Sequence, residues 1–199
     1  MKKIAIILLS IVILTGLVSC GNKSSENTLE IYLVSGELPD GENVDINKLV
    51  LEKTPIITLD DIQRYYWEEQ TFVIKKDLLR ERLMERLNVA PGKMPVPYYG
   101  KPYVVVANGE RIYIGKFWSA LSSSIESSYP IIYIEFAAIG KDYDEYNNLE
   151  PDQQLYAVTF NKLLDDDGNW VNKDGAQVIF DKRIHKVLEK AGLLAEIEQ

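Results

Sequence analysis

The stretch YVVVANGERIYIGKF, residues 103 to 117, decides the fold. It opens with Tyr103 and the β-branched residues Val104 to Val106, and residues 110 to 117 then alternate apolar and polar side chains, as a half-buried strand does. Between them, Asn108-Gly109 is the dipeptide that tolerates positive φ at both central positions of a type I′ turn. The stretch therefore predicts an antiparallel hairpin. Alternation divides its second strand into two faces: Ile112, Ile114 and Lys116 on one, and Arg111, Tyr113 and Gly115 on the other.

Working outward, the flanking sequence predicts further strands at 29–34, 49–51, 71–75, 131–136, 155–160 and 176–180. Thr58 to Asp61 reads as a helix start, with a threonine cap and acids in the first turn. Residues 181–191 form a predicted helix that Asp181 caps and Gly192 ends. The sequence therefore predicts the α+β class, with an antiparallel sheet and helices packed on one face.

A second predicted helix spans residues 76–87, where leucines repeat every four residues at Leu79, Leu83 and Leu87. We expect this leucine stripe to pack on the sheet. The opposite face has mixed charge and is predicted to be solvated: Arg80, Glu81, Arg82, Glu85 and Arg86.

Composition narrows the classes of function. The chain has 199 residues, of which 46% are hydrophobic, enough for a sizeable core. One Cys and one His exclude an internal disulfide, a zinc ribbon and a histidine relay. The formal net charge is −8, and it becomes −10 once residues 1–19 are removed. This acidity opposes non-specific attraction to nucleic acid or anionic headgroups, so no nucleic-acid partner is expected.

The N-terminal segment has the features of a signal peptide. Lys2 and Lys3 precede an apolar run from residue 4 to 18, which is shorter than the roughly 20 residues of a membrane-spanning helix. The run ends in Leu-Val-Ser-Cys at residues 17–20, which resembles the bacterial lipobox. That resemblance implies cleavage before Cys20 and a diacylglyceryl group on its thiol. We expect a signal peptide at 1–19, a flexible tether at 20–27, and a single α+β domain at 28–199, with a subdivision near residue 140 as the alternative.

Candidate catalytic and metal-binding groups have plainer interpretations. Asp165, Asp167 and Asn169 alternate like calcium ligands, but Trp170 and Ala176 replace the Gly and Glu of an EF-hand loop, so a solvated turn is favoured and no metal is expected. His185 lies on a helix flank. In Lys116-x-x-Ser119 the lysine precedes the serine, which is the reverse of the Ser-x-x-Lys motif of a Ser-Lys hydrolase. Glu68 and Glu69 are adjacent in a predicted strand or irregular segment, so they would point in opposite directions.

Aromatic residues allow two interpretations. A stacking surface for sugars or peptides is one, and an ordinary core is the other and is favoured. The residues concerned are Tyr65, Tyr66, Trp67, Trp118 and Tyr129.

Three blocks, residues 51–67, 71–83 and 100–118, together resemble the head part of the first periplasmic domain of the SecD and SecDF export proteins. The shared features are a Pro-x-hydrophobic-Thr-x-x-Asp-Ile segment, a strand with an amphipathic helix, and a hairpin with an Asn-Gly or Asp-Gly turn. This resemblance implies a head domain that touches extracytoplasmic polypeptide, and it carries over no catalytic residue.

Together these features predict a non-catalytic binding or accessory module, lipid-anchored through Cys20 to a bacterial membrane on its extracytoplasmic side, in the cell envelope. Its expected partners are the membrane, through the acyl chains, and an envelope protein or exported polypeptide. No cofactor is expected. A carbohydrate- or ligand-binding lipoprotein and a carboxylate-dependent envelope hydrolase are the alternatives.

Overall fold

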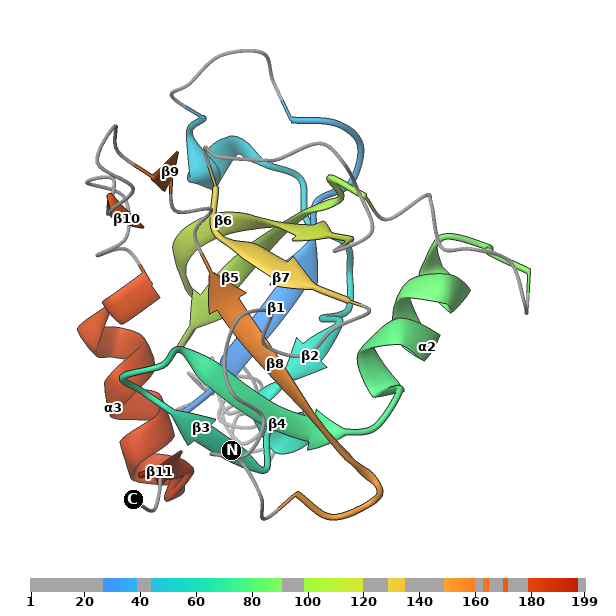
Figure 1. Ribbon diagram of the computed structural model, residues 1–199. Helices are drawn as coiled ribbons and strands as arrows, with labels where there is room; N and C mark the ends of the chain where they lie inside the picture. The colour runs from blue at the N-terminus through green and yellow to red at the C-terminus, as the bar shows by residue number, and fades with distance from the viewer. Residues whose placement is uncertain are drawn as a thin grey trace, which may run out of the picture.

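The computed structural model describes residues 27–38, 44–90, 99–119, 129–134, 149–159, 163–164, 170–171 and 179–196. Over these ranges a nine-stranded sheet has the order β11-β3-β4-β8-β7-β6-β5-β1-β2, and β9 and β10 form a separate pair (Figure 1). The strands of the large sheet are β1 (Leu29–Leu33), β2 (Ile57–Thr58), β3 (Arg64–Tyr66), β4 (Thr71–Lys75), β5 (Pro102–Ala107), β6 (Glu110–Trp118), β7 (Ile131–Tyr133), β8 (Gln153–Thr159) and β11 (Leu194–Ala195). The remaining elements are β9 (Leu163–Leu164), β10 (Trp170–Val171), the helices α2 (Leu78–Arg86) and α3 (Lys182–Ala191), and the 3-10 turns η1 (Ile46–Lys48) and η2 (Leu59–Asp61).

The predicted hairpin is confirmed as β5 and β6, with φ of 51° at Asn108 and 80° at Gly109. The predicted division of β6 into two faces is wrong at its start. A bulge shifts the register, so that Tyr113 pairs with Val105 and Arg111 with Val106, and Ile112 has no cross-strand partner. As a result Ile112 and Tyr113 both pack into the main core, and Ile114 packs on the other face of the sheet.

The sheet is mixed, so the prediction of a purely antiparallel sheet is wrong for two strand pairs. β7 runs parallel to β6, with Lys116 opposite Ile131, and β11 runs parallel to β3, with Leu194 opposite Tyr65. Parallel neighbours need a crossover of about a dozen residues, and the twelve residues between β6 and β7 are long enough for one. β8 lies between β4 and β7, so sequence from both sides of residue 140 enters one sheet.

Three smaller predictions need correction. The helix predicted to start at Thr58 is only the 3-10 turn η2, after which the chain enters β3. The strand predicted at 49–51 is reduced to a single bridge between Val34 and Leu51. Ile179 and Phe180 lie in a helical turn before α3 rather than in a strand, and residues 176–178 fall outside the described residues.

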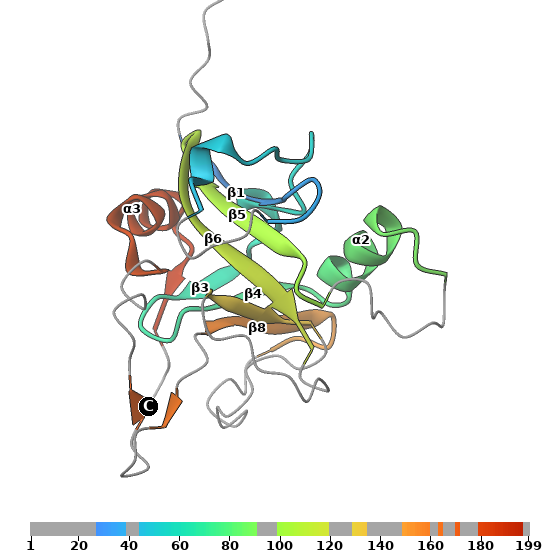
Figure 2. The ribbon, with the colours of Figure 1, turned by 90° about the horizontal axis from the view of Figure 1, so that it is seen from above.

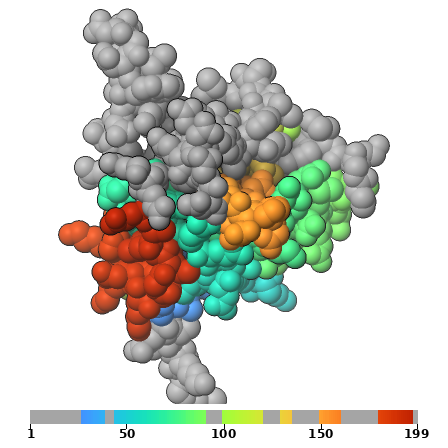
Figure 3. Space-filling view, turned by 60° about the horizontal axis from the view of Figure 1, so that its bottom comes forward, coloured from blue at the N-terminus to red at the C-terminus, as the bar shows by residue number. Residues whose placement is uncertain are grey.

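The main core fills the concave side of the curled sheet. Tyr103, Tyr156, Phe72 and Phe117 are its largest fully buried side chains. Both helices contribute to it, α2 with Leu79 and Leu83, and α3 with Ile184, Val187 and Leu188. In Figure 1 α3 lies to the left of the strands and α2 to the right, and in Figure 3 the orange segment that contains β8 is visible between them. Figure 2 shows the same separation of the two helices from above. Neither helix, nor any other in the described ranges, has the length and apolarity needed to cross a membrane.

The opposite face of the sheet carries two further apolar clusters. One contains Val34, Leu49, Val104 and Val106, and the other contains Tyr66, Val73, Leu155 and Ala157. Because both faces are covered, all six residues of β5 are buried. Arg111 holds the segment 46–49 against the first cluster, since its guanidinium donates to the backbone carbonyls of Ile46 and Leu49.

The charged face of α2 is not uniformly solvated, contrary to the prediction. Arg80, Glu81 and Glu85 are exposed. Arg82, however, forms a two-bond ion pair with Asp61, with N···O distances of 2.6 and 2.9 Å. Arg86 pairs with Glu52 at 2.8 Å. These two arginines therefore attach α2 to η2, through Asp61, and to the segment before it, through Glu52.

Candidate functional site: a groove at the rim of the sheet

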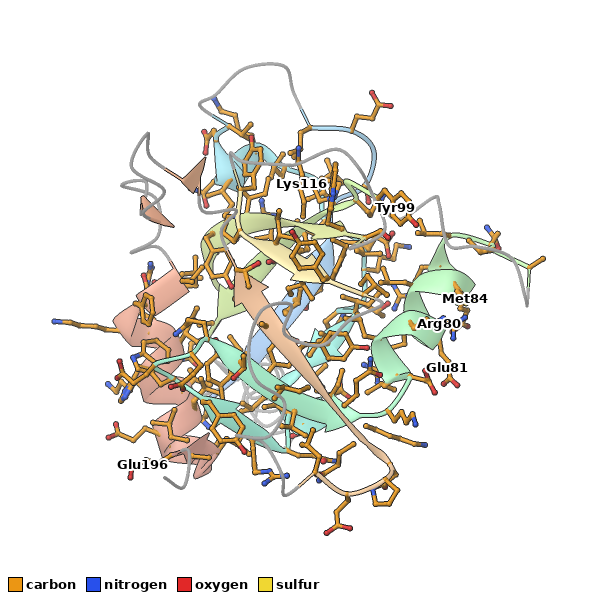
Figure 4. All side chains as sticks on the ribbon, in the orientation of Figure 1. Arg80, Glu81, Met84, Tyr99, Lys116 and Glu196 are labelled. Atoms are coloured by element: carbon orange, nitrogen blue, oxygen red, sulfur yellow. The ribbon has the colours of Figure 1, made fainter. Side chains whose placement is uncertain are left out.

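A groove of about 500 Å³ lies at one end of β5 and β6. Its volume falls within the roughly 300–1,000 Å³ that is usual for ligand pockets. Eight residues line it: Gly36, Glu37, Leu38, Tyr99, Gly100, Lys101, Pro102 and Lys116. In Figure 4, Lys116 and Tyr99 lie at the same upper rim, apart from the labelled residues of α2 and from Glu196.

Glycine shapes this rim. The amide of Gly100 donates to the carbonyl of Phe117, and the amide of Phe117 donates to the carbonyl of Lys101, each at 2.9 Å. Gly100 and Lys101 therefore both oppose Phe117, which is a β-bulge with a glycine at φ +73° in its first position. A Cβ on Gly100 would lie 3.3 Å from Cζ3 of Trp118, so the tryptophan ring packs closely against this backbone. The bulge ends the regular ladder and forms one wall of the groove.

The charge of the groove is opposite in sign to that of the chain. Among the described residues that line it, Lys101 and Lys116 face one acid, Glu37, whereas the chain as a whole has a net charge of −8. The Lys116 ammonium lies 4.8 Å from the ring centroid of Tyr129, which is a cation–π contact. The described part of the lining thus carries one more basic than acidic side chain.

The five aromatic residues considered as a stacking surface are divided between different places. Tyr65 and Tyr66 are buried, with 5% and 6% exposure. Trp67 is half-buried and packs edge-on against two rings. The distance between ring centroids is 4.9 Å to His185 and 5.8 Å to Phe180. Trp118 and Tyr129 contact groove residues instead. The five aromatic side chains therefore do not form one stacking surface.

The remaining candidate groups lie in structural surroundings. His185 packs on Trp67, and Ser119 is buried while Lys116 lies over Tyr129. Glu68 and Glu69 occupy the turn between β3 and β4 rather than a strand. Within the described ranges, His, Cys, Asp and Glu nowhere gather in threes around a possible metal position. Asp165, Asp167, Asn169 and Cys20 lie outside the described residues, although β9 and β10, on either side of 165–169, pair antiparallel.

Buried tyrosine hydroxyls lie in the core rather than in the groove. Burial is the main cause that raises the pKa of Tyr103 and of Tyr113 well above 10.0. Both phenols are therefore protonated at neutral pH. An interior cavity of about 20 Å³ beside Tyr113 has an otherwise mainly apolar lining, including Leu29, Val105 and Ile184. It has room for about one water molecule and for no larger ligand.

The start of the described chain is attached to the opposite end of the same strands. The amides of Asn27 and Thr28 both donate to Oδ1 of Asn108 at 2.9 Å, and the amide of Asn108 donates to the carbonyl of Thr28 at 2.9 Å. This clamp, made by Asn27, Thr28 and Asn108, fixes where the preceding chain leaves the domain. Between the clamp and the groove lie about five residues of β5, or roughly 17 Å.

No family model, curated protein or solved structure matches this chain. We therefore infer the function from the groove and the clamp. Sequence reasoning did not select Glu37, Tyr99 or Lys101. The available signal was the Tyr-Gly-Lys-Pro run at 99–102, a turn directly before a buried strand.

Proposed function

We propose that the protein is a lipid-anchored, extracytoplasmic binding module of a bacterial cell envelope. The observation that carries this proposal is the position of the clamp at one end of β5 and β6 and of the groove at the other. A chain anchored at Cys20 leaves the domain at the clamp, so the groove is held on the far side, away from the bilayer.

Dimensions support this orientation. If the predicted tether at 20–27 is a flexible chain, the expected root-mean-square distance between Cys20 and the clamp is about 15 Å. A domain of this length has a diameter of about 40 Å. Because the tether is shorter than the domain, it restricts rotation and keeps the clamp end nearest the membrane.

A binding role without catalysis agrees with the surroundings of the candidate residues. His185 packs against Trp67, Ser119 is buried, and the ammonium of Lys116 faces a tyrosine ring. We also propose that both helices cover one face of the sheet, the concave one, since their apolar side chains share one core cluster. Ligands would then bind at the rim rather than inside the curl.

The resemblance to SecD and SecDF head domains supports an exported polypeptide or an envelope protein as the partner. A carbohydrate ligand is the second candidate, and it is favoured by the position of Trp118 and Tyr129 beside the groove. In either case the anchor raises the local concentration of the module beside membrane partners.

Changing the lipidated residue tests the anchor. We expect Cys20→Ala to block acylation and processing and to release the protein from the membrane on carbonate or salt washing, because two or three acyl chains hold a protein durably. Mass spectrometry of the membrane fraction should find a mature N-terminal Cys20 with diacylglyceryl mass. Ser25→Ala, in the same tether, is the matched control. A Cys20→Ala protein as membrane-bound and as processed as the wild type would contradict the proposal.

Crosslinking in intact cells tests the binding role. A photoreactive residue at Glu37, in the groove, should capture an envelope component, whereas the same residue at exposed Glu189 on α3 should not capture it. A parallel screen against glycan, ester and peptide substrates should show no turnover. Turnover that disappears when one Asp or Glu is changed, while the fold persists, would show an enzyme instead.

A further inference from the structure

The outward face of α3 carries three lysines, which we call the lysine stripe. Lys182, Lys186 and Lys190 are exposed and four residues apart, so they project from one side of the helix, over about 12 Å along its axis. Glu189 is the single exposed acid among the residues of α3. The inner face of the helix is buried in the main core, which holds the lysine stripe toward solvent.

The lysine stripe is available to a partner. The ion pairs in the described part of the chain join other residues, and none of them includes a lysine of the stripe. Arg183, on the same helix, is by contrast paired with Asp181 and with Glu110, each at 2.8 Å. Like charges four residues apart on a helix repel each other. An anionic surface opposite the stripe would therefore bind it and relieve this repulsion.

The helix α3 lies beside the clamp. It packs against β1 and β5, whose paired ends adjoin the clamp. Near the start of the helix, Arg183 reaches Glu110, two residues after Asn108 of the clamp. In Figure 3 the red α3 borders the blue start of the described chain. If the chain is anchored at Cys20 as proposed, the lysine stripe is held close to the bilayer, whereas the groove lies at the far end of β5 and β6.

We propose that the lysine stripe docks α3 on anionic phospholipid headgroups of the membrane that holds the anchor. This inference rests on the proposed anchoring and specifies which surface of the domain meets the bilayer. Each lysine close to an anionic membrane surface favours the docked state about fivefold, so three lysines outweigh the single Glu189. The net charge of −8 opposes contact at long range, but salt screens charges farther away than about 10 Å, so the residues nearest the bilayer decide. An acidic polypeptide is the competing partner, and the position beside the clamp favours the lipid surface.

Quenching by lipids with a nitroxide headgroup tests the proposal with the lipidated protein in vesicles. A fluorescent probe on Glu189→Cys, a change that all the compared proteins carry, reports how close the outward face of α3 comes to the headgroups. Vesicles of phosphatidylcholine are compared with vesicles that also contain phosphatidylglycerol. We expect at least about twofold stronger quenching with phosphatidylglycerol, and a difference that disappears as added salt screens the charges.

Replacing the lysine stripe should prevent docking. Lys182→Gln, Lys186→Gln and Lys190→Gln together should reduce the phosphatidylglycerol-dependent part of the quenching at least about fivefold. Gln has nearly the helix propensity of Lys, so α3 should remain folded, which circular dichroism checks. Lys186→Gln alone, in the middle of the stripe, should reduce that part about twofold, and it keeps the proposal testable if the triple variant unfolds.

A control triple variant removes the same charge elsewhere. Lys53→Gln, Lys75→Gln and Lys76→Gln, at exposed positions outside α3, should change the phosphatidylglycerol-dependent quenching by less than about 1.5-fold. Equal losses in the two triple variants, or equal quenching in the two kinds of vesicle, would overturn the proposal. So would tighter binding of a polyglutamate peptide than of the vesicles through the same three lysines, which would identify an acidic polypeptide as the partner.

The anchor is tested separately from the docking. Mass spectrometry checks each protein for the diacylglyceryl group on Cys20 before the quenching is measured. Absence of docking in a correctly lipidated protein would refute this inference and leave the anchor proposal intact. Absence of the lipid on Cys20 would refute the anchor, and this inference with it.

Discussion

At the scale of the residue, Gly115 is required by a close contact rather than by a turn. A Cβ at position 115 would collide with the ring and hydroxyl of Tyr103, the residue that faces it across the β5–β6 ladder. Tyr103 is fully buried in the main core, so its ring has no free space into which to move. The glycine therefore makes room for one of the largest fully buried side chains of the main core.

Gly115→Ala should lower the free energy of unfolding by about 2–3 kcal/mol, the cost of overpacking a closed core. Tyr103→Leu should remove the collision, so we expect the two changes together to cost at least about 1 kcal/mol less than the sum of the single changes. Urea denaturation of the four proteins gives this coupling. Strict additivity would mean that the backbone moves to admit the methyl group.

Asp61 should make the free energy of unfolding depend on pH in the acidic range. Burial alone would raise its pKa, but hydrogen bonds from Arg82 and Thr58 outweigh burial and lower the pKa below 3.8. Its stabilising effect is therefore complete above about pH 5 and is lost as the pH falls through 3.8 toward the folded-state pKa.

Asp61→Asn should cost about 1–3 kcal/mol of unfolding free energy at pH 7, because it weakens charge-assisted hydrogen bonds and leaves Arg82 without its counter-ion. The loss should be smaller at pH 3, where the wild type is itself losing the interaction. Asp60→Asn, at the exposed neighbouring position, should keep the pH dependence of the wild type. Thermal melts between pH 3 and 7 measure all three proteins.

At the scale of the element, α2 is held by two different interactions. Its inner face buries Leu79 and Leu83 completely, whereas the N-cap residue Asp77 has a left-handed backbone and no capping bond from its side chain. Packing and the arginine pairs therefore hold this short helix, as expected for nine residues that are too few to be stable alone.

Leu83→Ala should lower the free energy of unfolding by about 2–5 kcal/mol, because it leaves a cavity at a fully buried position. Glu81→Ala, on the exposed face of the same helix, should change it by less than about 0.5 kcal/mol. A loss below about half a kcal/mol for Leu83→Ala would mean that the helix does not pack as described.

At the scale of the whole molecule, the clamp and the groove define an axis along β5 and β6. If the domain is tethered at the clamp, Glu110, next to the Asn108-Gly109 turn, lies nearer the bilayer than Glu37 does. If Cys20 is lipidated as proposed, a cysteine introduced at either position is the free thiol of the mature chain.

Fluorescent probes on Glu110→Cys and Glu37→Cys proteins should report how this axis is oriented relative to the bilayer of a liposome. We expect nitroxide lipids to quench the probe at position 110 more strongly than the probe at position 37, since the tether is shorter than the domain. Cys20→Ala versions of both proteins are the controls and should show no difference. Equal or reversed quenching in the lipidated proteins would contradict the proposed orientation.

Local interactions explain what the sequence by itself determined. The hairpin at Asn108-Gly109, the strand at 71–75, the leucine stripe of α2 and the Asp181 and Gly192 ends of α3 each depend on neighbours within a few residues. Backbone preferences and short-range periodicity act over such distances, so a pattern in the chain is sufficient.

Only the tertiary structure decided the rest. β7 beside β6 and β11 beside β3 join segments whose pairing leaves no local pattern, and the two bulges at Ile112 and Gly100 arise where strands must fit a curled sheet. The groove likewise combines a loop after β1 with the ends of β5 and β6, and the pair of Arg82 with Asp61 joins a helix to a turn 21 residues earlier. Such contacts depend on the packing of the whole chain, and that packing is a property of the folded molecule rather than of any one stretch of sequence.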